Sequence, residues 1–574
     1  MKKILILNNE NDVSEYLKSN FFYDMIIALN YKVAIHCSQN NIKFIYIKDI
    51  LKNNKSNLSK LLKDSFLISK TIDEKIKISK KIFEKNNYFS NYQKFSVGLL
   101  YIQTYSNYLN LLVNKFKEYN FFYYECNTED HFNFLVEGIK VYKKKYLNRF
   151  YKILYKKKLY KNNYFDTDDD PSVNNFKKLF LGLTNMNLNK KSCFLMYLLD
   201  KEYEKKAQIF AKKNNINLFF YKESLLNKNY IKNFNIEKIF NSKITKNKTK
   251  DLFLKKYLKY MMPKIINTVI YTKKNIEKII KKNSFLLFLS SHNTLVSNTI
   301  RETFNKKNIK TLTTLHGGTV GHFKKGLFWP DLAHNNLPKA ELSFYQTYSD
   351  IQKKILIKKN YFFNTNHNSQ YLTFESENFN KLIKNIPIKK KSSLNIGYII
   401  QSNDNIVSNF NEGINDPLNL YKFRSDFLTK IINKKNCNLI VSFNEKNLSF
   451  FADKVLIKKA KNLDKLKIYK MEALSVLKQS DVVILEQPST TLIESLYLKV
   501  PTIIVINNPL WDFEKKQKKL LNKRILFVKS YNDIFKLFNK NISIPAKDNI
   551  FLNQFYTKEK KKNFDYFLNK LVIT

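Results

Sequence analysis

Residues 481–505, DVVILEQPSTTLIESLYLKVPTIIV, predict a strand, a sharp turn, a helix and a second strand in direct succession. The first apolar run ends ahead of Pro488, which has no N–H group to donate to a strand ladder. Leu492, Ile493 and Leu496 then recur with helical spacing, and the run VPTIIV follows at once as another buried strand. A strand–turn–helix–strand unit of this kind is typical of a parallel α/β sheet.

The turn of this unit carries three adjacent hydroxyl residues, Ser489, Thr490 and Thr491, at the expected start of the helix. The N-terminus of a helix exposes unpaired N–H groups and a partial positive charge, so it attracts anions such as phosphate. Glu494 falls one helical turn beyond Thr490 and could accept a hydrogen bond from a ribose hydroxyl. The alternative is that Ser489 only caps the helix and that Glu494 is a surface acid. Because ligands bind at the carboxyl edge of open α/β sheets, the turn is equally compatible with a phosphate-bearing ligand.

A second candidate turn follows the strand-like stretch IKTLTTL, residues 309–315. The chain has nine glycines in all, and four of them stand at positions 317, 318, 321 and 326. Gly317 and Gly318, directly after His316, would let the backbone adopt positive φ and approach a ligand closely. His316 could act as a general base or donate to phosphate oxygens, or it could simply hydrogen-bond to the backbone of a tight turn. A metal site formed with the nearby histidines matches no ligand spacing that we can support.

Short strand-like runs alternate with helical stretches along most of the chain, which predicts an α/β fold with mostly parallel sheets. We expect one α/β domain over residues 1–385 and a second over residues 386–548. Inside the first domain, residues 14–30 have helical spacing, and residues 55–160 are expected to form a helical insertion. Residues 549–574 predict a terminal helix.

Composition limits the classes of function. No run approaches the roughly 18 apolar residues of a membrane-spanning helix. The start MKKILILNN predicts a buried strand rather than a signal peptide, and the four scattered cysteines fit free thiols in a reducing cytoplasm. The formal net charge of +53 comes almost wholly from lysine, since only four of the 101 basic residues are arginine. Proteins that read nucleic acids usually depend on arginine, so we interpret most lysines as solvated, with attraction to an anionic membrane or substrate as the alternative.

The sequence TLHGGTVG at the end of one α/β unit, followed by PSTTLIESLYLKVPTIIV late in the next, resembles the GT-B glycosyltransferases. The closer similarity is to bacterial transferases of surface-carbohydrate (O-antigen and capsule type) biosynthesis, and it covers roughly residues 284–350 and 394–574. The resemblance implies two Rossmann-like domains that face each other across the active site. It also implies that the terminal helix crosses back over the domain junction.

The resemblance gives each residue of the two turns a role. His316 would be catalytic, and with Gly317 and Gly318 it would face the transferred sugar and its phosphates. The remaining donor-binding residues would be Ser489, Thr490 and Thr491 for the diphosphate and Glu494 for the ribose. Arg424 stands on the helix after the first strand of the second domain, where such folds often have a basic contact to the diphosphate. A structural salt bridge is the alternative role for this arginine.

The predicted function is the transfer of a sugar from a nucleotide-sugar donor to a lipid-linked or glycan acceptor in surface polysaccharide biosynthesis. We expect no bound metal and no cofactor besides the nucleotide-sugar substrate, and a cytoplasmic location that could include the anionic inner-membrane surface. A nucleotide-sugar epimerase or a glycerol-phosphate-type transferase on the same fold is the alternative. A basic nucleic-acid-binding protein is the alternative of another class, which the scarcity of arginine and the dispersed lysines disfavour, so no nucleic-acid partner is expected.

Overall fold

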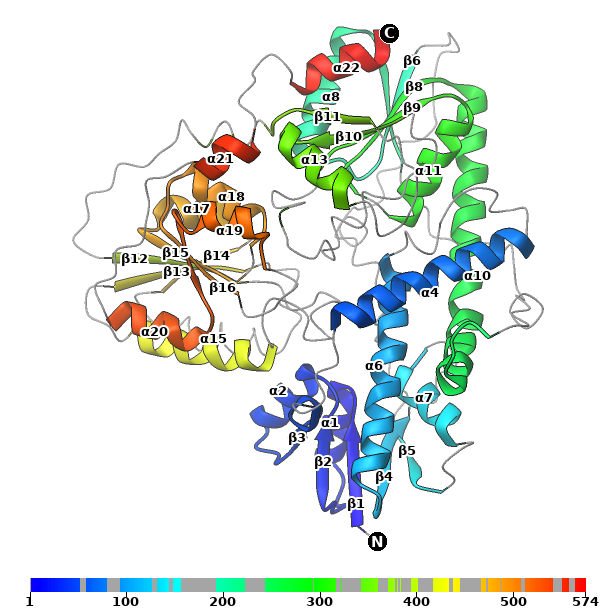
Figure 1. The fold of residues 1–574 in the computed structure, drawn as a ribbon, viewed down its shortest axis with the longest axis vertical. Helices are drawn as coiled ribbons and strands as arrows, with labels where there is room; N and C mark the ends of the chain where they lie inside the picture. Colours follow the sequence, from blue (N-terminus) through cyan, green and yellow to red (C-terminus); the bar gives the residue numbers. More distant parts are fainter. Residues whose placement is uncertain are drawn as a thin grey trace.

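The computed structural model contains three parallel β-sheets, each flanked by helices (Figure 1). They belong to three successive parts of the chain, which we call the first, second and third unit. The α/β class expected from the sequence is thereby confirmed. The structure describes residues 2–51, 58–79, 93–125, 132–143, 148–155, 192–221, 243–292, 294–315, 322, 342–359, 370–376, 379, 382, 394–400, 417–432, 437–443, 466–470, 473–486, 488–506, 512–539, 550–556 and 563–573.

The first unit is a five-stranded sheet with the order β3-β2-β1-β4-β5, in which every strand pair is parallel. Its strands are β1 (Lys2–Leu7), β2 (Met25–Ala28), β3 (Ile45–Tyr46), β4 (Tyr119–Glu125) and β5 (Phe150–Leu154). Its helices are α1 (Glu10–Leu17), α2 (Tyr31–Gln39), α3 (Ile47–Leu51), α4 (Leu58–Ser79), α6 (Gln93–Lys115) and α7 (Phe134–Lys143). β1 is buried from its third residue onward, because it has strands on both sides and helices on its faces.

Two expectations for this unit are wrong in part. Residues 14–30 do not form one helix, since α1 ends at Leu17 and residues 25–28 pair with β1 as β2. Residues 55–160 hold α4, α6 and α7, but β4 and β5 also lie there and complete the sheet. Short aromatic runs such as YNFFYYE in β4 lack a clear period, and periodicity alone does not separate a strand from a helix in them. The predicted domain 1–385 therefore contains two sheets rather than one sheet with a helical insertion.

The second unit is a six-stranded sheet with the order β11-β10-β9-β8-β6-β7. Its strands are β6 (Ser192–Met196), β7 (Asn217–Phe220), β8 (Ser284–Ser290), β9 (Lys310–Thr313), β10 (Ser343–Thr347) and β11 (Gln370–Thr373). Its helices are α8 (Lys201–Lys213), α10 (Lys248–Lys282), α11 (Leu295–Lys306) and α13 (Asp350–Lys359). The 35-residue helix α10 packs on α6 and α7 of the first unit and on α11 and β8 of the second, so it joins the two units.

The third unit is a six-stranded sheet with the order β14-β13-β12-β15-β16-β17. Its strands are β12 (Leu394–Ile399), β13 (Cys437–Phe443), β14 (Leu466–Lys470), β15 (Val482–Leu485), β16 (Thr502–Val505) and β17 (Ile525–Val528). Its helices are α15 (Pro417–Ile432), α17 (Ala473–Gln479), α18 (Thr490–Tyr497), α19 (Lys515–Leu521) and α20 (Tyr531–Asn539). The strand–turn–helix–strand unit predicted for residues 481–505 is confirmed as β15, α18 and β16.

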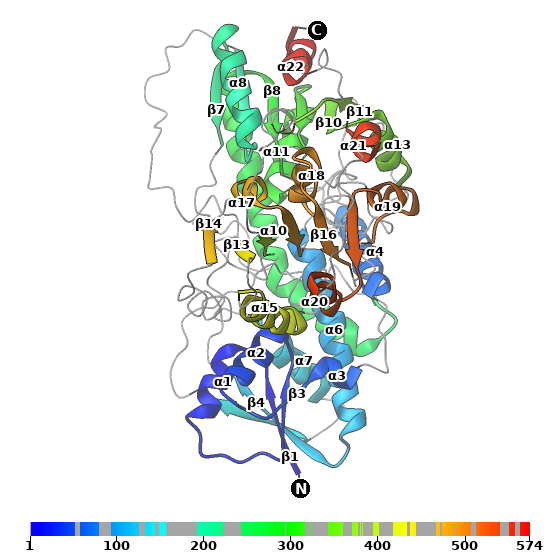
Figure 2. The ribbon, with the colours of Figure 1, turned by 90° about the vertical axis from the view of Figure 1, so that its left-hand side faces the viewer.

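After the third unit the chain returns to the second. α21 (Ile550–Phe555) packs on α18 and α19 of the third unit and on α13 of the second. α22 (Phe564–Ile573) then packs on α8 and β8, at the end of the molecule opposite the N-terminus (Figures 1 and 2). The single helix expected over residues 549–574 is thus two helices, and the return across the junction that the GT-B resemblance implies is confirmed, with α21 at the junction and α22 on the second unit.

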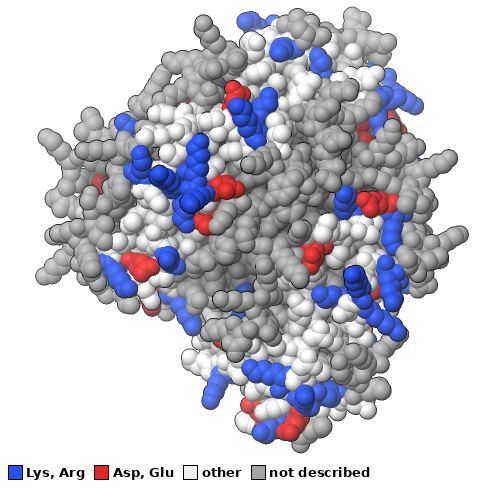
Figure 3. All heavy atoms as spheres, in the orientation of Figure 1, with Lys and Arg blue, Asp and Glu red and all other residues white. Residues whose placement is uncertain are grey.

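Lysine and arginine occupy different places in this protein. Basic side chains are spread over the face shown in Figure 3, with acidic ones between them. Arg301, Arg424 and Arg524 are instead buried, with at most 1% of their surface exposed. The guanidinium of Arg301 donates to the Ser290 hydroxyl at 2.8 Å and to the His292 carbonyl at 2.9 Å, which fixes the turn between β8 and α11. The planar fork of arginine presents five N–H donors in a fixed geometry, whereas a lysine ammonium presents three on a flexible stem.

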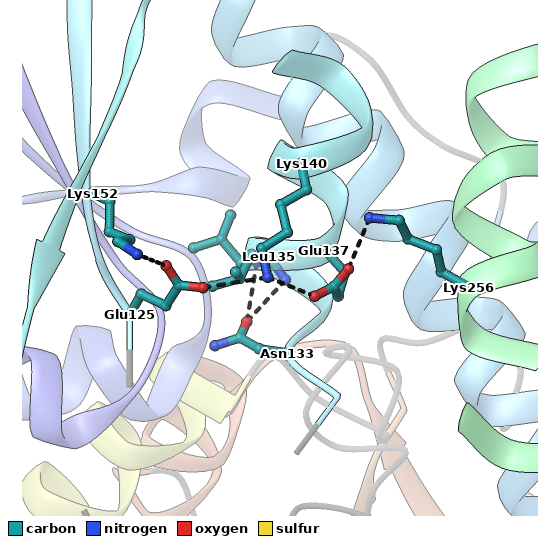
Figure 4. A network of polar contacts seen from close by, with 8 residues as sticks. Glu125, Asn133, Leu135, Glu137, Lys140, Lys152 and Lys256 are labelled. Carbon is teal, nitrogen blue, oxygen red and sulfur yellow. Dashed lines mark hydrogen bonds and ion pairs between the residues drawn. The ribbon is translucent and has the colours of Figure 1, made fainter. Parts of the chain in front are cut away.

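A chain of ion pairs attaches α10 to the first unit (Figure 4). Glu125, at the end of β4, lies 3.1 Å from the Lys152 ammonium and 3.4 Å from that of Lys140. Glu137 on α7 lies 2.9 Å from Lys140 and 3.1 Å from Lys256 on α10. The three lysines are almost half exposed, so each pair contributes at most about 1 kcal/mol, and the network orients α10 more than it stabilises the fold.

Candidate functional site

The third sheet has the strand order of a dinucleotide-binding Rossmann sheet. Numbered within the unit, its order is 3-2-1-4-5-6, with β12 as strand 1 and β15 as strand 4. The chain leaves these two neighbouring strands in opposite directions along the sheet, and ligands of open α/β sheets bind outside the carboxyl ends of such a pair. β15 ends at Leu485 and α18 begins at Thr490, so the predicted hydroxyl-rich turn lies at this position.

The hydroxyl group of Ser489 does not cap its own helix. Ser489 is the N-cap residue of α18 and has extended backbone angles, but its side chain accepts no hydrogen bond from the first turn. By contrast, Ser530 accepts from the N–H group of Asp533 at the start of α20. The half-buried side chains of Ser489 and Thr491 are therefore available to a ligand. This geometry disfavours the alternative in which Ser489 is only a helix cap.

Glu494 lies one turn into α18 with its side chain half-buried, so it is not the surface acid of the alternative interpretation. Removal from water raises the pKa of Glu494 above its usual 4.5, because burial disfavours the charged form. No described residue forms a hydrogen bond or an ion pair with its carboxylate. A ligand hydroxyl could supply the missing hydrogen bond.

The Glu494→Gln variant is expected to be more stable than the wild type at neutral pH. The raised pKa means that the folded state holds the proton more tightly than the unfolded state, so the free energy of unfolding falls as pH rises from 4.5 through the raised pKa. Glutamine does not ionise, so the variant does not lose free energy of unfolding over this pH range. Urea unfolding should give a higher midpoint for the variant at about pH 7 and similar midpoints near pH 4. A lower midpoint at pH 7 would show that the carboxylate has a stabilising partner.

Arg424 is held in the core of the third unit, which corrects its predicted role as a contact to the donor diphosphate. Its Nε donates to Oε1 of Glu486 at 2.9 Å and its Nη2 to Oε2 at 2.5 Å, and neither side chain has more than 1% of its surface exposed. The Tyr398 hydroxyl donates to the same carboxylate. The structural salt bridge, the alternative left open by the sequence, is therefore the role that the structure supports. Because Glu486 directly follows β15, this pair fixes the start of the turn.

The glycine-rich turn is described only at its two flanks. The three predicted residues His316, Gly317 and Gly318 lie outside the described residues. Leu315, directly before them, is 2% exposed and shares a hydrophobic cluster with Leu492 and Ile493 of α18. On the other side, His322 is fully buried, its ring packs on Phe555 of α21, and its carbonyl accepts from the N–H group of Glu514 at 3.0 Å. One end of the loop thus lies in a cluster formed by the second and third units, and the other end contacts α21 and the third unit.

A histidine–aspartate pair at the carboxyl edge of the second sheet was missed by the sequence analysis. Numbered within the unit, this sheet has the order 2-1-3-4-5-6, and its direction of connection changes between β6 and β8. Asp200 follows β6 and His292 follows β8, and the His292 Nε2 lies 3.9 Å from Asp200 Oδ1. Both side chains are about one-third exposed. The hydroxyl groups of Ser291 and Thr314 are 2.5 Å apart, so the pair lies beside the strand that leads to the glycine-rich turn.

The corresponding position in the first unit is filled by a carboxylate of the chain itself. This sheet also has the order 3-2-1-4-5, with β1 and β4 at the change of direction. Oδ2 of Asp12 accepts from the N–H groups of Asn8 at 2.6 Å and Asn9 at 3.0 Å, and the Tyr155 hydroxyl donates to Oδ1. Burial raises the pKa of Asp12 to about 6 in spite of these bonds, so it is largely charged at neutral pH. The negative charge of Asp12 would repel a bound phosphate, so the third unit is the better candidate for a nucleotide site.

Within the described residues, no group of three His, Cys, Asp or Glu side chains is arranged so that it could hold a metal ion. Among the described helices, none combines the length and the hydropathy needed to cross a bilayer.

Comparison with known proteins supports a transferase. Residues 391–523 match the model of the LIC12162 family transferase, a segment that begins just before β12 and ends after α19. A comparison with curated proteins finds no match. Among solved structures, the chain is similar to the UDP-GlcNAc 2-epimerase from Methanocaldococcus jannaschii, with 14% identity, 67% of this chain and 99% of that chain covered, and a TM-score of 0.37. It is also similar to MurG from Acinetobacter baumannii, with 11% identity, 67% and 99% covered, and a TM-score of 0.33. A glycosyltransferase from Rickettsia africae gives 13% identity, 64% and 95% covered, and a TM-score of 0.33.

The family match and the fold agree on the same part of the molecule. The matched segment contains the Rossmann strand order from β12 to β16 and the Ser489 turn between β15 and α18. The second and third sheets are both parallel, and α21 packs on both units before α22 returns to the second, as the GT-B resemblance implies for the end of the chain. The protein is therefore GT-B-like in its fold, and its third unit is similar to the LIC12162 family of transferases.

Proposed function

We propose that the protein is a glycosyltransferase that moves a sugar from a nucleotide-sugar donor to a lipid-linked or glycan acceptor in surface polysaccharide biosynthesis. One observation carries the proposal. The Ser489 turn lies at the carboxyl end of β15 beside β12, with an uncapped hydroxyl and a half-buried Glu494 that has no described partner. The match to a transferase family over residues 391–523 supports the same region as the nucleotide site.

In this proposal the donor diphosphate binds at the N-terminus of α18. The hydroxyl groups of Ser489, Thr490 and Thr491 donate to it, and Glu494 accepts from the ribose. When the bond between sugar and diphosphate breaks, negative charge grows on the leaving group, and donors already fixed around it stabilise that charge without a metal ion. His316, with Gly317 and Gly318, would face the sugar and its phosphates from the second unit.

We further propose that His292 is the general base for the acceptor. The acceptor hydroxyl would give its proton to the imidazole as its oxygen forms a bond to the anomeric carbon, while the bond from that carbon to the diphosphate breaks. Asp200, 3.9 Å away, would stabilise the imidazolium that results. The position of this pair beside Thr314, two residues ahead of His316, supports the assignment.

The nucleotide site is tested by two matched serine variants of the third unit. Ser489→Ala/Thr491→Ala should weaken binding of nucleoside diphosphates about 100-fold or more, because two hydrogen bonds to a charged group are lost. Its stability should change little, since the Ser489 side chain makes no capping bond. Ser530→Ala should do the reverse, lowering stability by about 1 kcal/mol through the lost α20 cap and leaving affinity unchanged. Thermal unfolding with and without a panel of nucleotides measures both the stability and the nucleotide affinity of each variant, because a ligand raises stability by mass action. Equal binding by the double variant and the wild type would remove the proposed site.

Product analysis separates the reactions that the fold could support. A transferase converts the nucleotide-sugar to a nucleoside diphosphate in step with glycosylation of an added acceptor, whereas an epimerase changes the sugar without any acceptor. Release of a nucleoside monophosphate would instead indicate transfer of a glycerol-phosphate-type unit. We also propose a cytoplasmic location with attachment to the anionic inner-membrane surface, where lipid-linked acceptors would be found.

A further inference from the structure

The first unit exposes two adjacent phenylalanine side chains on the loop between α1 and β2. Phe21 is 68% exposed and Phe22 is 82% exposed, and Leu17 at the end of α1 is 50% exposed. Tyr23, the next residue in the chain, is buried and packs on two further aromatic rings. The loop is thus anchored at Tyr23 while the pair of phenylalanines points outward. Large apolar side chains exposed together in this way mark an interaction surface more often than single ones do.

Lysines surround this pair because of the sheet topology. All five strands of the first unit are parallel, so their amino ends meet at one edge of the sheet. Among the described residues, the starts of these strands and the segments that lead into them carry six exposed lysines: Lys2, Lys3, Lys18, Lys43, Lys115 and Lys117. The exposed acidic residues described in the same segments are Asp24 and Glu118. The edge that carries Phe21 and Phe22 therefore has a clear excess of positive charge.

This edge lies at one end of the long axis of the molecule. The N-terminus and the dark-blue segment after α1 are found together there, opposite the C-terminus (Figures 1 and 2). The space-filling view shows basic side chains at this lower end, with a few acidic ones (Figure 3). An apolar pair at this end of the molecule can reach a flat surface without a collision from the other two units.

We infer that the amino edge of the first sheet docks on an anionic lipid bilayer. Phe21 and Phe22 enter the region between headgroups and acyl chains, and the surrounding lysines are attracted to anionic headgroups, which gives the two signals that stable peripheral binding requires. A second copy of this chain is a poorer occupant, because it would bring a second edge of the same positive charge. This inference deepens the membrane part of the proposed function, but it does not depend on the nucleotide site.

Vesicle flotation tests the inference on the full chain. With vesicles of phosphatidylcholine containing about 30% phosphatidylglycerol, Phe21→Ser/Phe22→Ser should lower the partition coefficient about tenfold or more. The matched control is Ile209→Ser/Ile357→Ser, since these side chains are 61% and 52% exposed on α8 and α13 of the second unit. The control should bind as the wild type does, and wild-type binding should fall when phosphatidylglycerol is omitted or salt is raised.

Three outcomes would overturn the inference. The first is equal flotation of the phenylalanine variant and the control. The second is equal wild-type binding to neutral and anionic vesicles. The third is a wild-type protein that is dimeric and binds no vesicles, with a phenylalanine variant that is monomeric. Urea unfolding of the same preparations shows that each variant is folded, and nucleotide binding is measured on them separately. If vesicle binding fails these tests while nucleotide binding is observed, the transferase proposal stands. If nucleotide binding is absent while vesicle binding depends on the phenylalanines, the docking edge stands.

Discussion

Replacing Arg424 with methionine is expected to lower the free energy of unfolding by about 3–5 kcal/mol, because it leaves the buried Glu486 carboxylate without its cation. Few other single changes should cost as much, since a typical domain has only about 5–15 kcal/mol in total. Methionine has a volume close to that of arginine, so the loss reports the unpaired charge more than a cavity. Urea unfolding of the wild type and the variant at neutral pH gives the difference directly.

The double variant Arg424→Met/Glu486→Gln is the control for this prediction. Glutamine removes the buried charge and can still accept from the Tyr398 hydroxyl, so much of the lost stability should return. The same variants decide between the two roles considered for Arg424. If it binds the donor diphosphate, as the GT-B resemblance implied, Arg424→Met would lose nucleotide affinity with less than about 1 kcal/mol of stability. The buried ion pair instead predicts a large loss of stability and little change in nucleotide affinity.

The His292→Asn variant is expected to lower kcat by about 10²–10⁴-fold, the usual contribution of a general base. Nucleotide affinity should remain within about twofold, because the nucleotide is held by the third unit in this account. Steady-state kinetics with saturating donor and acceptor separates kcat from KM.

Two further variants control the His292 prediction. Asp200→Asn should lower kcat by a smaller factor, since an amide can still orient the imidazole but stabilises the imidazolium less. His36→Asn, on α2 of the first unit, should leave kcat unchanged. Full activity of His292→Asn would return the catalytic role to His316.

The sequence predicted best where the deciding interactions are local. β15, α18 and β16 follow from an apolar run, Pro488, a hydroxyl N-cap and apolar spacing, all within 25 residues. The alternation of strands and helices was enough for the α/β class, and the strand-like stretch 309–315 contains β9. Such features depend on side chains and backbone that are neighbours in the chain, so a single sequence contains the relevant information.

The errors concern interactions between distant residues. β4 and β5 were assigned to a helical insertion, because their aromatic runs have no clear period and only pairing with β1 makes them strands. The partner of Arg424 lies 62 residues away, and Asp200 and His292 meet only where two parallel strands end at the same edge. No local pattern marks these pairs. The order of the strands could have indicated the Asp200–His292 pair, had the second sheet been recognised as a unit of its own.

The central claim is that the Ser489 turn and the glycine-rich turn close on one bound diphosphate, with backbone amides directed at it. Hydrogen–deuterium exchange measures those amides directly, with and without the nucleoside diphosphate that gives the largest thermal shift. The account predicts slower exchange on nucleotide binding in peptides covering residues 488–497 and 313–322, and no change in peptides covering residues 2–17. Protection confined to the first unit, or protection that avoids residues 488–497 altogether, would contradict it.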